Sequence, residues 1–220
     1  MKPSRAVLGV TLIALLACPM WAAGQPVTAV GLPRADASGL VGWFSANEEQ
    51  VKAHDDWYHR SWSADVSIGY YWTEHLKTEI TGGMTSEGEL WGVRISPLGG
   101  VYSPVVHQFS TRAVGIGQQY QFGHNAWFHP YLGGGVALEW VRQTEEREPT
   151  YQFGRSGSSP FLIEPARTIG PKTDARARPF VNSGFKAYMT ERSFFRSDVR
   201  VAFEHDVKDV GLRVGFGVDF

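Results

Sequence analysis

The sequence ends in Val210-Gly211-Leu212-Arg213-Val214-Gly215-Phe216-Gly217-Val218-Asp219-Phe220, a stretch that alternates strictly between two kinds of residue. Its even-numbered positions are all apolar, whereas its odd-numbered positions are glycine, arginine or aspartate. Because successive side chains of a β-strand point to opposite faces, this period of two predicts a strand with one apolar face and one face of small or charged residues.

Similar segments recur upstream and indicate an all-β chain. We expect strands near residues 61–72, 76–84, 106–122, 127–142, 177–189 and 194–205. A weaker strand near 38–47 precedes them, although residues 27–32 compete for that place. With the C-terminal strand the total is eight, an even number, as closure of a single-chain membrane barrel requires.

The connections between these strands alternate in length. Short turns join the two strands of each hairpin, at residues 73–75, 123–126 and 190–193. The stretch 143–176 is long and rich in Gly, Ser, Pro and charge, which predicts a solvated loop. In the other long stretch, 85–105, residues 88–95 and 101–107 can pair as a hairpin that continues the third and fourth strands. This pattern predicts an eight-stranded antiparallel transmembrane up-and-down β-barrel with both long stretches extracellular.

Aromatic residues on the apolar faces separate a membrane barrel from a soluble one, whose apolar face would fill its lumen. Those at the turn ends of the strands are Trp72, Phe122, Phe128, Phe195 and Phe220, and those towards the loop ends are Trp62, Trp140 and Phe203. The ten residues from Trp62 to Trp72 span about 25 Å at a tilt of about 40°, the height of a lipid-facing band. Two such belts are typical of aromatic rings at membrane interfaces and favour the membrane barrel over a lipocalin-like one.

The N-terminus predicts export. Residues 1–24 begin with a basic segment, continue with an apolar run too short to span a bilayer and end in small residues, the pattern of a secretory signal peptide. Residues 25–37 then form an N-terminal periplasmic segment, and residues 38–220 form the barrel. The stretch that ends in Cys18 also resembles a lipoprotein processing box, so lipidation of Cys18 stays open.

Composition argues against nucleic-acid-binding proteins and against membrane proteins that span the bilayer with helices. The net charge of −1 and the pI near 6.7 leave no basic stripe for a nucleic acid. After the N-terminal segment, no run reaches the roughly 18 apolar residues that a transmembrane helix needs. If the mature chain spans a membrane, it must then do so as a closed barrel, in which every backbone N–H and C=O group has a hydrogen-bond partner.

The polar faces of the later strands carry charges of both signs. The expected interior set is Glu139, Lys186, Arg196, Asp198, Arg200 and Glu204. An eight-stranded barrel is barely wide enough for its own side chains, so we expect a salt-bridge network that plugs the lumen. A narrow polar conduit is the alternative.

The sequence resembles the small outer-membrane β-barrel superfamily, the OmpA/OmpX-type and opacity-like proteins, over essentially the whole expected mature chain. The most specific element is C-terminal: Arg213, Gly215, Phe216, Val218 and Phe220 look like that superfamily's assembly signal. The resemblance implies a location in the bacterial outer membrane, with outer-membrane lipids and the barrel assembly machinery as partners.

Catalytic and metal chemistry find little support in the residue pattern. A hydrolase needs a serine nucleophile and a histidine base in contact, but His107 and Ser110 are three residues apart and point to opposite faces of one strand. The histidines and aspartates of residues 54–59 lie in an expected loop without defined geometry. We expect no cofactor and no metal.

The sequence therefore predicts a non-enzymatic outer-membrane barrel with a structural or surface-interaction role through its external loops, whose partner it does not name. A small pore or a barrel for hydrophobic-solute transport is the alternative. A lipid A-modifying outer-membrane enzyme is the third hypothesis.

Overall fold

The structure is a computed structural model, and it describes residues 34–46, 61–95, 102–123, 127–152 and 160–220. The predicted signal peptide, Cys18, the competing first strand at 27–32 and the loop histidines at 54–59 lie outside these ranges. No helix in the described part of the chain is long and apolar enough to cross a membrane.

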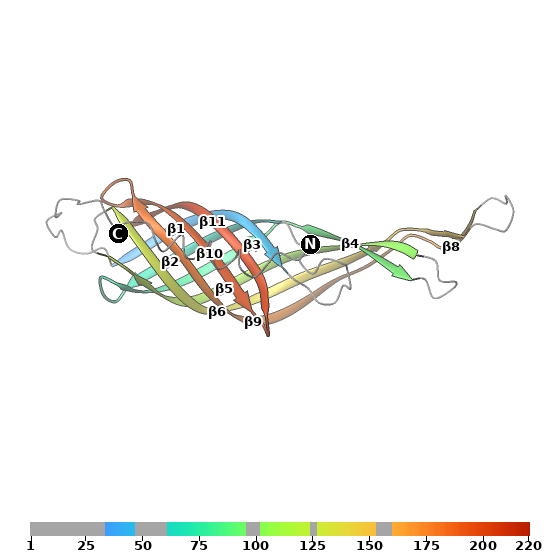
Figure 1. Cartoon of the computed structure of the whole chain (residues 1–220), viewed down its shortest axis with the longest axis horizontal. Coiled ribbons are helices and arrows are strands. Elements are labelled where there is room, and N and C mark those ends of the chain that lie inside the picture. Colours follow the sequence, from blue (N-terminus) through green and yellow to red (C-terminus); the bar gives the residue numbers. More distant parts are fainter. Residues whose placement is uncertain (1–33, 47–60, 96–101, 124–126, 153–159) are drawn as a thin grey trace, which may run out of the picture.

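The described residues form a barrel of tilted strands (Figure 1). The strands are β1 (Ala35–Ala46), β2 (Ser61–Tyr71), β3 (Leu76–Thr85), β4 (Gly88–Ile95), β5 (Tyr102–Gln121), β6 (Phe128–Arg147), β7 (Thr150–Gln152), β8 (Phe161–Glu164), β9 (Arg167–Tyr188), β10 (Ser193–Phe203) and β11 (Val207–Asp219). Eight of them close the barrel in the order β1-β2-β3-β5-β6-β9-β10-β11, with every neighbouring pair antiparallel and β11 paired with β1.

The barrel places its charged residues inside and its apolar residues outside. Arg196 and Lys77 are fully buried in the lumen, whereas Val66 is 66% exposed and Ile68 is 64% exposed on the outer face. A soluble barrel has the opposite arrangement, because its apolar side chains leave water by filling the interior. The fold is therefore an eight-stranded transmembrane β-barrel, as the alternation in the sequence predicted.

The seam between β1 and β11 joins the two ends of the barrel sheet. The strands pair from Asp36 opposite Asp219 to Ala46 opposite Asp209. The backbone amide of Ala35 donates to the carbonyl of Phe220 (3.1 Å), and the amide of Phe220 donates back (2.9 Å). Residues 35–37, which we expected in the periplasmic segment, thus belong to the barrel, because β11 offers them backbone partners down to its last residue.

A sheet extension, which we call the blade, projects from the loop end of the barrel (Figure 1). It consists of β4 and of residues 102–109 of β5, 142–147 of β6 and 167–173 of β9, with β7 and β8 beyond them. The hairpin expected within 85–105 is present as β4 and the start of β5. The stretch 143–176, which we expected to be a solvated loop between strands, is strand over most of its described residues, because β6 and β9 continue to pair up to Arg147 opposite Arg167.

A small core lies at the base of the blade. Leu90 and Phe109 of the blade pack with Val141 of β6, just below it, and all three are nearly fully buried. The Thr150 hydroxyl donates to the Ser103 hydroxyl (2.8 Å), which ties β7 to the start of β5. A segment rich in polar and turn-forming residues can therefore form paired strands here. The strand ladder supplies hydrogen-bond partners for its backbone amides and carbonyls, while one face stays in solvent.

Candidate functional site

The lumen contains a network of charges that begins at the turn end of the barrel. Asp36 accepts hydrogen bonds from Lys77 Nζ (2.9 Å), from Lys186 and from the Tyr71 hydroxyl (2.9 Å). Lys77 also donates to Glu79 Oε2 (2.6 Å), which links this cluster to the middle of the barrel. These groups come from β1, β2, β3 and β9, so the network joins strands on different sides of the lumen.

Arg196 occupies the middle of the lumen. Its guanidinium makes a two-pronged contact with Glu79, at 2.7 and 2.9 Å, and lies 3.0 Å from Asp198. Asp198 also accepts from the Tyr131 hydroxyl (2.6 Å) and from Arg213 Nε (2.7 Å). Because buried charges are costly unless they are paired and hydrogen-bonded, this arrangement favours a filled lumen over a water-filled conduit at this level.

A third cluster lies at the loop end. Arg178 contacts Glu139 Oε2 (3.0 Å) and Glu204 Oε2 (3.2 Å), while the Arg200 guanidinium lies 4.1 Å from the centre of the Phe180 ring. Glu204 follows the last residue of β10 and is partly exposed, so it lies at the mouth of the barrel rather than within the strand where we expected it.

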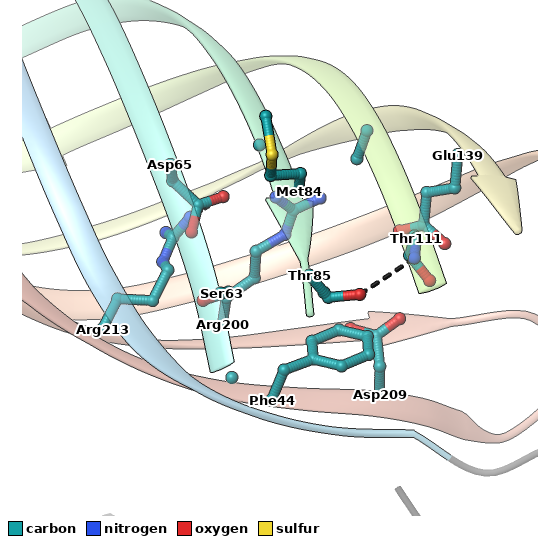
Figure 2. A pocket seen from close by; sticks show the side chains of 13 residues that line it. Phe44, Ser63, Asp65, Met84, Thr85, Thr111, Glu139, Arg200, Asp209 and Arg213 are labelled. Atoms are coloured by element: carbon teal, nitrogen blue, oxygen red, sulfur yellow. Dashed lines mark hydrogen bonds and ion pairs between the residues drawn. The ribbon is translucent and has the colours of Figure 1, made fainter. Parts of the chain in front are cut away.

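A small pocket of about 50 Å³ separates the middle and loop-end clusters. Figure 2 shows Asp65 beside Arg213 at one side of it, with Glu139 and Asp209 at the other. Asp65 Oδ2, Asp209 Oδ2 and Arg213 Nη1 are buried and have no hydrogen-bond partner among the described residues. A polar space of this size suits a few water molecules that bridge donors and acceptors.

The six interior charges expected from the sequence fall into these three clusters. Arg196 and Asp198 touch directly, whereas Glu139 and Glu204 meet through Arg178 and Lys186 connects through Asp36. Charged residues of the network that the expected set of six lacked include Asp36, Lys77, Glu79, Arg178 and Asp209. The period-two spacing of Lys77 and Glu79 within the expected strand 76–84 was the available signal for two of them.

The five residues of the proposed assembly signal divide between the two faces of β11. Arg213 points into the lumen, and Gly215 faces the same side. Phe216 (61% exposed), Val218 and Phe220 point outward. The apolar side of this motif is therefore continuous with the lipid-facing surface.

The expected belt residues lie on the outer face of the barrel. Trp62, Trp72, Phe122, Phe128 and Trp140 are exposed, and Phe195 and Phe203 are half-buried. Phe195 is less exposed because its ring packs on the neighbouring Phe185 and Phe216 rings, at centroid distances of 6.1 and 5.6 Å.

The histidines give no catalytic arrangement in the described residues. His107, in the blade, stacks on Phe109 and lies 3.4 Å from the Gln143 side-chain amide, and burial lowers the pKa of its imidazole against an opposing effect of Glu145. No cluster of His, Cys, Asp and Glu in the described ranges could hold a metal ion.

Comparison with known proteins places the fold. No family model and no curated protein sequence matches the chain. Among solved structures, Neisserial surface protein A is 14% identical with a TM-score of 0.54, over 84% of this chain and 97% of that one. OprG of Pseudomonas aeruginosa is 12% identical (TM-score 0.48, 86% and 98% covered) and Ail of Yersinia pestis is 13% identical (TM-score 0.47, 85% and 99% covered). The chain shares its fold with Neisserial surface protein A, which bears out the expected resemblance at the level of the fold.

Proposed function

We propose that this protein is a non-enzymatic barrel of the bacterial outer membrane that presents the blade for contacts at the cell surface. The observation that carries the proposal is the length of three strands: β5 and β6 have 20 residues and β9 has 22. A tilted strand crosses the hydrocarbon layer with about 9–11 residues, so roughly half of each strand extends beyond it. A connection between two transmembrane strands does not require paired strands with buried apolar side chains, so the blade points to a further role.

The blade also offers apolar surface to a partner. Trp91 on β4 is 63% exposed, and Tyr151, Phe161 and Leu162 on the β7–β8 hairpin are about half exposed. Exposed apolar side chains gathered on a projecting element favour contact with an apolar surface. Acidic and basic side chains are both present on the blade strands, so no strongly charged partner is favoured.

The proposal is tested by trimming the blade at a matched register. Arg147 and Arg167 are paired, so replacing residues 148–166 by Asn-Gly closes a shorter hairpin and leaves the barrel ladders intact. We expect cells that display the trimmed protein, which keeps Trp91 but lacks the β7–β8 hairpin, to lose most of their retention on polystyrene, an apolar surface. Retention on clean glass should change little.

A point-variant control separates apolar contact from blade length. The triple variant Tyr151→Ser, Phe161→Ser and Leu162→Ser keeps the hairpin and should lose retention on polystyrene nearly as fully as the trimmed protein. Heat-dependent migration on a gel verifies that each barrel is folded. Equal retention of wild-type and trimmed proteins at equal surface amounts would overturn the proposal, as would a change in lipid A or phospholipid mass on expression of the wild type.

A further inference from the structure

One charged side chain faces outward among the lipid-facing residues of the barrel. The lipid-facing positions of the eight barrel strands are every second residue of 35–43, 62–70, 76–84, 112–120, 128–140, 175–187, 195–203 and 210–220. Across these described positions, the side chains are apolar, small or uncharged except for that of Arg112, which is exposed. The charge of Arg112 on a lipid-facing surface therefore calls for a specific physical reason.

The strand register places Arg112 at the loop-end belt. It pairs with Met84 of β3 on one side and with Trp140 of β6 on the other, and all three point outward. Ten residues separate it from Phe122 at the turn end, the same separation as between Trp62 and Trp72. A cation on the lipid face is costly at the bilayer centre and becomes tolerable where its charge reaches the headgroups.

A second arginine lies diagonally across from Arg112 on the neighbouring strand, towards the loop end. Arg142 of β6 is exposed on the same outer face and pairs with Ser110 of β5, so it is the diagonal neighbour of Arg112, at about 7–8 Å between the two backbones. Neither guanidinium has an ion-pair partner among the described residues. Two flexible guanidinium groups at this spacing can converge on one anion.

We propose that Arg112 and Arg142 bind the phosphate group of a lipid in the loop-side leaflet. Guanidinium groups bind phosphate oxygens in pairs, and the anion would satisfy both cations at the depth where phosphates lie. Trp140 and Met84 would contact the upper part of the acyl chains beside it. The inference rests on the membrane location in the proposed function and is independent of the adhesive role of the blade.

The test is a lipid titration of the refolded barrel in detergent, followed by native mass spectrometry. The probe is phosphatidic acid, with phosphatidylcholine as the zwitterionic comparison. We expect the double variant Arg112→Gln and Arg142→Gln to bind phosphatidic acid roughly tenfold more weakly than wild type, as loss of charge-assisted hydrogen bonds implies. The matched control Arg167→Gln and Arg192→Gln removes two exposed arginines elsewhere and should bind as wild type does.

The outcomes distinguish this site from the proposed function. Equal binding by the wild type and the double variant, or equal weakening in the control, would overturn the site while the barrel remains. Displacement of phosphatidic acid by excess inorganic phosphate would also overturn it, because the site would then take a soluble anion. A wild-type protein without a heat-dependent gel shift would overturn the membrane location and the site together. Since glutamine suits the lipid face better than arginine does, the double variant is expected to fold.

Discussion

Arg196 connects several strands across the middle of the lumen. Its guanidinium is fully buried and contacts Glu79, Asp198 and Tyr131, which lie on β3, β10 and β6. These contacts bridge strands that are not neighbours in the sheet. The residue therefore ties opposite walls of the barrel together through side chains.

We predict that Arg196→Met lowers the free energy of unfolding by about 3–5 kcal/mol, because it leaves the buried Glu79 carboxylate without its two-pronged partner and removes one of the two guanidinium contacts of Asp198. Urea unfolding of the protein refolded into lipid vesicles, followed by tryptophan fluorescence, measures this change. The control Arg192→Met lies in an exposed turn and should change stability by less than about 0.5 kcal/mol. A urea midpoint for Arg196→Met equal to that of wild type would contradict the network's structural role.

His107 makes the blade sensitive to acid. Burial lowers the pKa of His107 below its ordinary value of 6.5, so the unfolded blade takes up a proton more readily than the folded one. The folded blade therefore keeps its full stability above the ordinary pKa of histidine, where His107 is neutral in both states, and loses stability as the pH falls below that value. We predict that hydrogen-exchange protection of the amides of residues 105–109, corrected for intrinsic rates, drops between about pH 7.5 and about pH 5.5. In His107→Gln this drop should vanish, and its persistence would assign the effect to another group.

Sequence alone indicated which side chains face inward but not which of them meet. The alternation placed Arg196 and Asp198 on one face because side-chain period depends only on the local strand. Their partner Glu79 lies 117 residues away from Arg196 along the chain. That contact depends on barrel closure and on the stagger between strands, neither of which a local pattern encodes.

At the scale of the element, β11 combines lipid contact with close approach to β1. A side chain at position 215 would overlap the carbonyl oxygen of Gly39 and the backbone of Leu40, so the seam accepts only glycine there without movement. Gly39, on the facing strand, points outward with open space around it. The glycine in the proposed assembly signal therefore has a packing role that is separate from recognition.

We predict that Gly215→Ala reduces the fraction of folded barrel, whereas Gly39→Ala leaves it near the wild-type level. Both variants add one methyl group within the same strand pair, and only the first meets backbone atoms. The folded fraction is measured as the heat-sensitive band after refolding into vesicles without any assembly factor. Equal folding of the two variants would mean that the seam relaxes enough to accept a methyl group at position 215.

The blade shows where element prediction from sequence failed. Composition suggested a solvated loop between residues 143 and 176 and gave no sign of strands there, yet β6 and β9 remain paired through most of its described part. Gly170 and Pro171 are accommodated next to a register shift between Gln143 and Glu145, so they interrupt the ladder without ending it. Turn-forming residues lower strand propensity, but cross-strand pairing with a long partner outweighs them here.

At the scale of the whole molecule, the contents of the lumen change along the barrel axis from the turn end to the loop end. Charges fill the lumen at the turn end and in the middle, a small polar pocket follows, and the blade rises beyond the mouth. The filled sections favour a barrel that serves as a membrane anchor for the blade. The pore hypothesis requires instead that these paired side chains move apart, which would expose several buried charges at once.

The two hypotheses differ in single-channel recordings. We predict that wild-type protein in planar bilayers gives no discrete conductance steps, because Lys186, Arg196 and Tyr131 are almost completely buried across the lumen at two levels. The triple variant with serine at these three positions removes bulk at both levels and should give small, regular steps if it folds, as a gel shift verifies. Phe180→Ser, which alters the loop end above both levels, should remain silent. Steps of the same size in the wild type and the triple variant would show that the network does not block the lumen, and would favour the pore over the sealed anchor.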